Sequence, residues 1–417
     1  MKVYLDNNAS SRVDPSVIEA MTPYFTEIIS PPSSDYGHSF GVEAKQALDS
    51  AREIIATKIY VDPSEIIFTS GQAESNNFAI KGIALANLNE VPKTLVASSV
   101  SHSTILDSLS SLKKLGFTVE LIKVDSEGFI NRDHLRQLLS DSDNPPLLVS
   151  IPHGNVEIGT VEDINEIASI CHEYNVPIHI EATYSFCKVT FDASRVDMAT
   201  IASHLIHGPK GVGALYLKKG LKIQRLIDGG LQENRKRGGT ENLPGIVGFA
   251  KAVELYSPEI NEKVKGLRDY LWGKFEEKIN DFKITGPIDK DKRLPNHYSV
   301  VINYVEGESI LLHLDMLDFM IATGSACSSK QLKASHVLSA IGLPTEVSHG
   351  SVRIGLSKYN TKEEVDQFVE HLVGVVERLR AISPMNADFM REWQEMKNKG
   401  MVEEEDHHHD FDDPEDN

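Results

Sequence analysis

The stretch Ile66-Ile67-Phe68-Thr69-Ser70-Gly71-Gln72-Ala73-Glu74 decides the fold of this chain. Its first four residues are apolar or β-branched, which is typical of a buried strand. The Ser-Gly turn that follows leads into a helical pattern, and we expect that helix to continue through Lys81. A buried strand that enters a helix through a short turn is typical of parallel sheets covered by helices. The stretch therefore predicts an α/β fold.

The same alternation of strands and helices continues on the carboxyl side of this stretch. The further strands that we expect are short and apolar, and they lie at 94–98, 119–122, 147–151 and 177–180. Helical patterns are found near 102–115, near 162–174 and, as one long helix, at 244–281. Continuous apolar strands joined by amphipathic helices predict a mostly parallel sheet with helices on both faces, connected by right-handed crossovers.

A change of pattern after residue 257 predicts a second domain. Strands are expected near 298–304 and 319–323, and helices near 331–341 and 361–381. We therefore divide the chain into a large α/β domain, a small α+β domain and a C-terminal segment, which occupy 13–257, 1–12 with 258–385, and 386–417. The C-terminal segment is predicted to hold one helix, at 386–399, followed by an acidic, disordered tail.

The composition excludes several classes of function. The 417 residues include 42 Lys and Arg against 61 Asp and Glu, a formal charge of −19, and residues 401–417 hold nine of the acids. The basic footprint of a nucleic-acid binder is missing, and no apolar run is long enough for a transmembrane helix. Three cysteines are too few for a disulfide framework and suit a reducing compartment. We expect a cytoplasmic protein that binds neither nucleic acid nor membrane.

Polar residues follow several of the predicted strands, at the edge where such sheets bind ligands. The turn with Gly71 and Gln72 presents backbone N–H groups and the start of a helix, which suit a phosphate. The other strand-end residues are His102, Asn155, Glu181 and the pair Ser203-His204. One polar residue at such a place is more often structural than functional, but four successive strand ends favour a binding site.

The order of motifs along residues 3–382 resembles that of the NifS/IscS cysteine desulfurases, within the class V aminotransferase-like, fold-type I pyridoxal-phosphate enzymes. The motifs that carry the resemblance are, in chain order, Tyr4-Leu5-Asp6-Asn7, Phe68-Thr69-Ser70-Gly71, Glu74-Ser75-Asn76-Asn77, His102, Asn155 with Glu157-Ile158-Gly159, Gly208-Pro209-Lys210-Gly211-Val212-Gly213, Arg237-Gly238-Gly239-Thr240-Glu241-Asn242, Gly324-Ser325-Ala326-Cys327 and Ser351-Val352-Arg353. The resemblance implies a sheet of the seven-stranded type in the large domain, and a homodimer whose sites are completed across its interface.

The resemblance also implies a chemistry. In this family a lysine holds pyridoxal phosphate as an imine, an aspartate pairs with the pyridine nitrogen, and a mobile cysteine takes the substrate sulfur as a persulfide. By resemblance, His102 stacks on the cofactor ring, Asn155 meets the phenolate or the substrate carboxylate, and Arg353 binds the substrate carboxylate. The remaining cofactor contacts implied are Gly71, Gln72, Glu181, Ser203, His204 and, from the other subunit, Thr240.

Four positions depart from the family pattern, and all of them belong to the expected cofactor pocket. The lysine position is Leu205, so no amine is available there for an imine. The aspartate is Glu181, the glutamine three residues later is Tyr184, and the threonine of the phosphate turn is Ala73. Losing that hydroxyl removes a charge-assisted hydrogen bond worth about 1.5–3 kcal/mol.

Two other lysines are poor replacements for the missing amine. Lys210 lies five residues beyond Leu205, after a Gly-Pro pair, and Lys188 follows the strand of Glu181. We therefore predict that pyridoxal phosphate is absent or held non-covalently in this chain.

Cys327 lies in a stretch of small residues, 323–329, that carries no apolar burial pattern. The resemblance matches it to the persulfide cysteine, whereas Cys171 and Cys187 lie in apolar contexts typical of a core. A thiolate is a soft ligand for iron. Cys327 is therefore predicted to accept sulfur or to be one ligand of an iron–sulfur cluster shared with a partner.

Three functions remain open. The first is a desulfurase homologue without covalent cofactor that works in iron–sulfur cluster assembly with an IscU-type scaffold, where Cys327 is a cluster ligand or accepts externally supplied sulfide. The second is an active L-cysteine desulfurase that holds pyridoxal phosphate non-covalently and forms its persulfide on Cys327. The third is a non-catalytic subunit that dimerises with an active paralogue. The triplet His407-His408-His409 is interpreted as part of a solvated tail rather than as a metal site.

Overall fold

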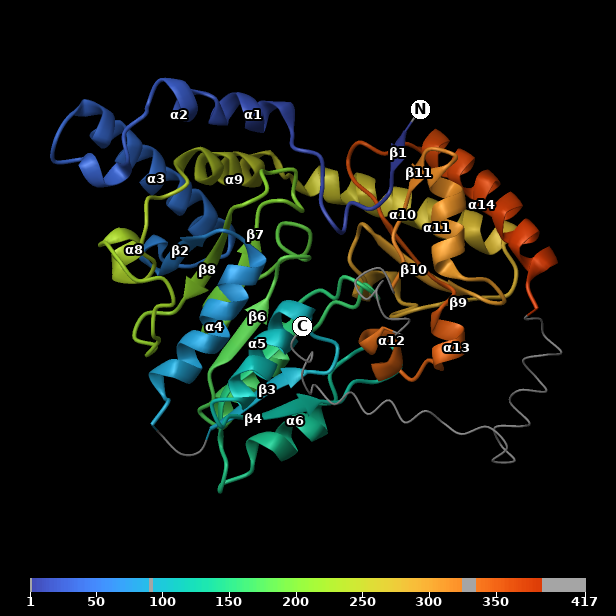
Figure 1. The fold of residues 1–417 in the computed structure, drawn as a ribbon, viewed down its shortest axis with the longest axis horizontal. Helices are drawn as coiled ribbons and strands as arrows, with labels where there is room; N and C mark the ends of the chain where they lie inside the picture. The colour runs from blue at the N-terminus through green and yellow to red at the C-terminus, as the bar shows by residue number, and fades with distance from the viewer. Residues whose placement is uncertain (1, 90–92, 325–334, 385–417) are drawn as a thin grey trace, which may run out of the picture.

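A computed structural model describes residues 2–89, 93–324 and 335–384. A seven-stranded sheet forms the centre of the larger part, with strand order β2-β8-β7-β6-β5-β3-β4 (Figure 1). Its strands are β2 (Ile66–Thr69), β3 (Thr94–Ser98), β4 (Thr118–Ile122), β5 (Pro146–Pro152), β6 (Ile178–Glu181), β7 (Met198–Ala202) and β8 (Gly213–Leu217). β8 runs antiparallel to both of its neighbours, β2 and β7, and all other neighbouring pairs of this sheet are parallel. The predicted mostly parallel sheet is thereby confirmed.

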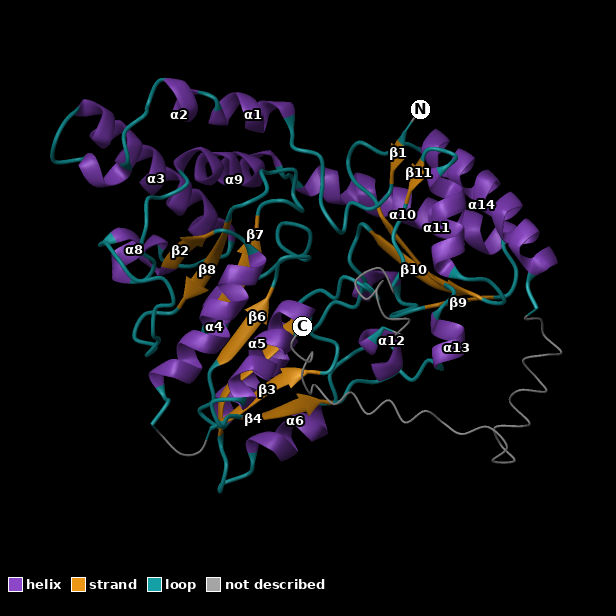
Figure 2. Ribbon diagram, viewed as in Figure 1, coloured by secondary structure: helices purple, strands orange, loops and turns teal. Residues whose placement is uncertain are grey.

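Helices cover both faces of this sheet (Figure 2). Successive side chains of a strand point to opposite faces, so Ile66 and Phe68 join one apolar cluster and Ile67 joins another. The first face is covered by α1 (Pro15–Met21), α3 (Ser39–Lys58), α6 (Arg132–Leu139), α7 (Ile164–Glu173) and α9 (Leu243–Leu255). The second is covered by α4 (Gln72–Ala86) and α5 (Ser103–Lys113). This is the three-layer arrangement expected of strand–helix repeats.

A second core lies beside this unit, around a smaller sheet of order β12-β10-β9. Its elements are α10 (Pro258–Lys278), β9 (Phe282–Ile284), β10 (His297–Ile302), α11 (Gly307–Asp315), β12 (Ser351–Gly355) and α14 (Lys362–Ile382), with β1 (Val3–Tyr4) pairing parallel to β11 (Phe319–Met320). The Tyr298 ring centroid lies 5.3 Å from that of Trp272 and 5.2 Å from that of Phe275, so α10 is fixed on the sheet by aromatic packing.

Short elements connect these units. They are α2 (Pro23–Thr26), η1 (Pro32–Ser34), η2 (Pro63–Glu65), η3 (Ala193–Arg195), α8 (Gln232–Arg235), η4 (Lys290–Lys292), α12 (His336–Ala340) and α13 (Thr345–Ser348). In the described part of the chain, no helix combines the length and the apolar character needed to span a membrane. The division of the chain at residue 257 stays a prediction.

The long helix predicted at 244–281 is wrong, because the structure has two helices there. α9 ends at Leu255, and α10 begins at Pro258. A proline lacks the N–H that a helix interior needs but fits the first turn of a new helix, so Pro258 is a start signal. The strands β9 and β12 had no sequence prediction, and the predicted helix at 386–399 lies outside the described residues.

Candidate functional site

A cavity of about 500 Å³ lies where the carboxyl ends of β3, β5 and β6 face β12 and the residues before α12. It is the kind of crevice in which open α/β sheets bind ligands. Six residues that the sequence singled out line it together: Gln72, His102, Asn155, Glu181, His204 and Arg353. The structure therefore brings into one cavity residues that are up to 281 positions apart in the chain (72 to 353).

His102 stands at the N-cap of α5. Its Nδ1 accepts the backbone N–H of Thr104 at 3.2 Å, which leaves Nε2 to carry the ring proton. Burial, followed by charge interactions with His336 and Arg353, lowers the pKa of His102 to about 4. The imidazole is therefore neutral at pH 7, where it offers a stacking face and one N–H donor but no positive charge.

Asn155 holds the turn that follows β5. Its side-chain oxygen accepts the N–H groups of Glu157 at 2.8 Å and Ile158 at 3.0 Å, and its Nδ2 donates to the Val100 carbonyl at 2.9 Å. Both lone pairs of the oxygen are then in use, and one Nδ2 hydrogen remains for the cavity. Asn155 is thus a structural residue as well as a lining residue.

Glu181 is the last residue of β6 and is fully buried. Its Oε1 accepts the Thr183 N–H at 2.9 Å. Burial raises the pKa of Glu181 to about 7, although the hydrogen bonds from Thr183 act in the opposite direction. Burial therefore favours the neutral form of this carboxyl group.

Leu205 fills the place where the resemblance expects the lysine. Its side chain is 2% exposed and packs in an apolar cluster with Tyr184 and Leu294. Tyr184 lines the cavity, with its ring centroid 6.0 Å from that of His102 and the two planes tilted by 40°. The residues that stand at the lysine and glutamine positions therefore belong to one apolar cluster, of which Tyr184 lines the cavity.

No lysine from the described ranges lines this cavity. Lys188 is buried without a hydrogen-bond partner for its Nζ, and burial lowers its pKa to about 8. Lys210 is exposed. Neither of these two lysines lines the cavity.

Three other predicted cofactor contacts lie away from the cavity. Gly71 precedes α4 with φ of 143°, a conformation that favours glycine, but it does not line the cavity. The Ser203 hydroxyl is buried without a partner and points at Gly208, where an added Cβ would lie 1.9 Å from it. Thr240 is exposed and lines a separate cavity of about 90 Å³. Their cofactor roles stay predictions.

Arg353 and Glu157 form a charged region of the cavity. The guanidinium Nη2 of Arg353 lies 3.5 Å from Asp6, and its Nε is buried without a hydrogen-bond partner. Burial raises the pKa of Glu157 to about 7, opposed by a hydrogen bond from Ser335 and by the charge of Arg353. Sequence reasoning missed Glu157 and His336 as lining residues. Glu157 could have been predicted to line the cavity from its position two residues after Asn155, in the turn at the end of a strand.

Cys327 lies outside the described residues, between Gly324 and Ser335. Both of these flanking residues line the cavity, so the segment that carries Cys327 starts and ends there. Cys171 and Cys187 are buried and unpaired, and burial raises the pKa of both thiols to about 12. Cys171 and Cys187 therefore belong to the core, as their apolar sequence context suggests.

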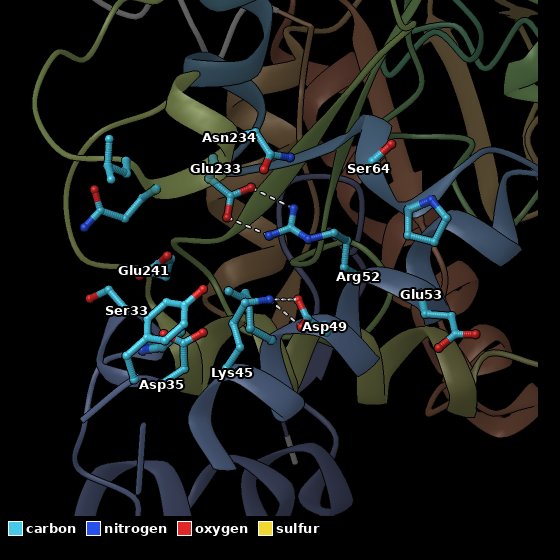
Figure 3. Close-up of a pocket in the computed structure, with 16 residues that line it drawn as sticks. Ser33, Asp35, Lys45, Asp49, Arg52, Glu53, Ser64, Glu233, Asn234 and Glu241 are labelled. Atoms are coloured by element: carbon cyan, nitrogen blue, oxygen red, sulfur yellow. Dashed lines mark hydrogen bonds and ion pairs between the residues drawn. The ribbon is translucent and has the colours of Figure 1, made fainter. Parts of the chain in front are cut away.

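A second cavity, of about 770 Å³, lies between η1, α3 and the segment around α8 (Figure 3). Arg52 of α3 crosses it and holds Glu233 by two hydrogen bonds of 2.8 Å, while Glu233 also accepts the Phe68 N–H at 2.9 Å. Glu233 and the next two residues have φ values of 47°, 54° and 64°, which side chains rarely adopt. The ion pair fixes this left-handed turn against β2.

The comparison with protein families agrees with this geometry. The model for the family described as aminotransferase class-V matches residues 3–368. The chain belongs to the class-V aminotransferase family.

Relatives within the class-V aminotransferase family are cysteine desulfurases by name. The chain is 45% identical over 398 residues to cysteine desulfurase IscS of Dictyoglomus turgidum, which covers 94% of this chain and 98% of that protein. It is 42% identical over 387 residues to cysteine desulfurase IscS 1 of Archaeoglobus fulgidus, and the match covers 92% of this chain and 99% of that protein. A solved NifS-like protein superposes with a TM-score of 0.83 at 34% identity, covering 91% of this chain and all of that one (100%).

The class-V aminotransferase family uses pyridoxal phosphate, and the residues of this chain do not fit its covalent form. The lysine position holds the buried hydrocarbon side chain of Leu205, which carries no amine. The Oε1 of Glu181 is already bonded to Thr183, and Ser203 turns its hydroxyl toward Gly208. A phosphate at the start of α4 would meet Ala73, which has no side-chain donor.

Proposed function

We propose that this cysteine desulfurase homologue works in iron–sulfur cluster assembly, together with an IscU-type scaffold and without covalent pyridoxal phosphate. The observation that carries the proposal is Leu205, a buried apolar residue at the position of the lysine, which shares an apolar cluster with Tyr184. Tyr184, His102 and Arg353 line the cavity. A hydrocarbon side chain forms no imine. The chain would therefore contribute a thiol and a binding surface for the scaffold. It would not extract sulfur from cysteine itself.

Cys327 is the residue that we propose to act. As a thiolate it is a soft ligand that suits iron, and a scaffold's cysteines would supply the rest of the cluster shell. As a sulfur acceptor it would take the outer sulfur of a persulfide donor, which leaves as a thiol. That transfer breaks one S–S bond and forms another, so it needs no external oxidant.

The test is cluster reconstitution with the scaffold, iron and a persulfide donor, using the full chain and its Cys327→Ala variant. We expect Cys327→Ala to lower cluster yield or the stability of the complex with the scaffold. Cys187→Ser is the matched control, because its thiol is buried and has a pKa raised to about 12. Equal yield and equal complex stability for the wild type and Cys327→Ala would reject the proposal.

A second candidate is an L-cysteine desulfurase that uses pyridoxal phosphate held non-covalently. It is supported by the names of the relatives and by the cavity position of His102 and Arg353. Without the lysine such an enzyme would lose proton transfers that commonly contribute about 10²–10⁴-fold to the rate. Cysteine-dependent sulfide release clearly above that of the free cofactor would favour this candidate, and release at the background rate would remove it.

A further inference from the structure

We propose that the cavity at the strand ends binds a free α-amino acid as a zwitterion, and that Glu157 and Ser101 bind its ammonium group. The proposal rests on the proposed function in one respect, since it takes the cavity to work without covalent pyridoxal phosphate. An amino acid that forms no imine keeps its ammonium group charged at pH 7. A charged group inside a protein needs a partner of opposite charge, and the family resemblance supplies one only for the carboxylate, at Arg353.

Polar atoms without partners are gathered in this cavity. Among the described residues that line it, five have a buried side-chain nitrogen or oxygen with no hydrogen-bond partner. These atoms are Nδ2 of Asn8, Nε2 of Gln72, Oγ of Ser101, Oε1 of Glu157 and Nε of Arg353. Buried polar atoms are nearly always hydrogen-bonded, so a group of them in one cavity points to a polar ligand. Apart from Gln72, which begins α4, they divide into two nitrogens and two oxygens.

The two nitrogens are donors for a carboxylate. Nη2 of Arg353 lies 3.5 Å from Asp6, while Nε of the same guanidinium has no partner. The Asn8 side chain is 2% exposed, and its Oδ1 accepts Nδ2–H of Asn296 at 2.8 Å, so its own Nδ2 is the group that remains. Gly355 lies two residues after Arg353 on β12, and a Cβ added there would lie 2.9 Å from Nδ2 of Asn8. Asn8 therefore adds a second donor beside the arginine.

The two oxygens are acceptors for an ammonium group. Ser101 is fully buried, and neither its Oγ nor Oε1 of Glu157 has a partner. Asn155 holds the backbone on both sides, because its Nδ2 donates to the carbonyl of Val100, next to Ser101, at 2.9 Å and its Oδ1 accepts the Glu157 N–H at 2.8 Å. One side chain thus fixes the segments that carry both acceptors. A small rotation of either acceptor side chain is the kind of change that ligand binding commonly brings.

The two halves of the cavity carry opposite charges that are not paired with each other. Ser351 lies on the same face of β12 as Arg353. A Cβ added at Gly324 would lie 2.9 Å from Oγ of Ser351 and 2.7 Å from Oε1 of Glu157, so this carboxyl group approaches β12. Arg353 forms its ion pair with Asp6, and no ion pair joins it to the described side chain of Glu157. An α-amino acid carries both charges on one carbon and therefore fits between two such groups.

The test is equilibrium dialysis of the full chain, freed of any cofactor, against three small probes. L-alanine carries both charges, propionate lacks the ammonium group, and ethylamine lacks the carboxylate. We expect L-alanine to bind about 10- to 100-fold more tightly than propionate, the contribution of one hydrogen bond between charged groups. Ethylamine should also bind more weakly than L-alanine, because it makes no contact with Arg353.

Three variants separate the two halves of the cavity. Glu157→Gln keeps the shape and removes the charge, so it should weaken L-alanine about 10-fold and leave propionate within about twofold of the wild type. Arg353→Gln should weaken both probes. Glu162→Gln is the matched control, because Glu162 also follows β5 and is buried, but its carboxyl group accepts the Ile130 N–H at 2.6 Å and does not line the cavity. It should leave the binding of every probe unchanged.

Equal binding of L-alanine and propionate by the wild type would overturn the proposal, and this comparison decides the matter even where a variant does not fold. Equal weakening of L-alanine by Glu157→Gln and Glu162→Gln would overturn it as well, and so would the absence of measurable binding by all three probes. The dialysis contains no iron, scaffold or pyridoxal phosphate. If cluster assembly fails while L-alanine binds as expected, the proposed function is rejected and the amino-acid site remains.

Discussion

At the scale of single residues, Leu205 is the residue on which the proposed function depends, because it occupies the family's lysine position. Replacing it by lysine places an amine in the apolar cluster with Tyr184 and Leu294. We expect Leu205→Lys to lower the free energy of unfolding by about 2–4 kcal/mol, measured by urea denaturation, because the amine lacks a partner there. Leu205→Met, which keeps the volume, should cost less than about 1.5 kcal/mol.

The same variants test the cofactor. We expect the wild type to gain no pyridoxyl mass after incubation with pyridoxal phosphate and borohydride reduction. Adding Tyr184→Gln and Ala73→Thr to Leu205→Lys restores the family pattern at three of the four departing positions and should restore labelling at residue 205. A stoichiometric pyridoxyl adduct on any lysine of the wild type would contradict our view of the pocket.

Glu181 makes a prediction about pH. Its pKa of about 7 in the folded chain exceeds the value of about 4.3 expected when unfolded, so the folded state binds more protons between these values. Its contribution to stability is fully present below pH 4.3 and is lost as the pH rises through 7. Glu181→Gln should therefore gain about 2 kcal/mol relative to the wild type between pH 5 and pH 8. The measurement is urea denaturation of both proteins across this pH range. If the free energy of unfolding of the wild type and of Glu181→Gln changed with pH in the same way, the prediction would be contradicted.

At the ends of strands, the sequence was enough to bring predicted site residues into one cavity, while the roles of these residues stay predictions. His102, Asn155 and Glu181 followed recognisable strands, so their meeting in one cavity followed from topology. The direction in which a side chain points depends on the residues packed around it, and the sequence pattern does not show which residues these are. The closeness of the Ser203 hydroxyl to Gly208 is one such detail that the sequence did not predict.

At the scale of elements, the pair of Arg52 and Glu233 joins α3, β2 and the left-handed turn. The two side chains are only 12% and 2% exposed. Removing the cation leaves a buried carboxylate, so we expect Arg52→Met to lower the free energy of unfolding by about 3–5 kcal/mol. Lys45→Met breaks the exposed pair with Asp49 in the same cavity and should cost less than about 1 kcal/mol. Equal denaturation midpoints for the two variants would show that the turn does not depend on the pair.

Element boundaries followed the sequence wherever periodicity and a start or stop signal agreed. β2 and β3 lie where predicted, because each is a short apolar run followed by a turn or a cap. The break between α9 and α10 was missed, since the apolar pattern continues across Ser257-Pro258 and only the proline marks it. β12 was missed because its five residues include Arg353, and a strand between a turn and a helix gives little periodicity.

At the scale of the whole molecule, large apolar side chains are exposed on the segments that surround the larger cavity. Phe25 is 62%, Ile29 70%, Tyr36 99% and Leu231 69% exposed. Tyr36 and Leu231 line the same cavity. Exposed apolar residues gathered on one region are typical of an interaction surface. Together with the homodimer that the resemblance implies, they predict that a second copy of this chain, or a paralogue, covers η1 and the segment around α8.

We expect the purified chain to sediment as a dimer and the double variant Phe25→Glu/Tyr36→Glu to sediment as a monomer, because two buried carboxylates without partners oppose association. Leu312→Glu is the control, since Leu312 is 63% exposed on α11 of the other unit. It should leave the dimer intact. Thr240 is exposed and precedes Glu241, which lines the larger cavity, so we expect a dimer through this surface to bring Thr240 toward the partner. A variant that stays dimeric would exclude this surface, and copurification of an active paralogue in equal amount would identify the second copy as that paralogue.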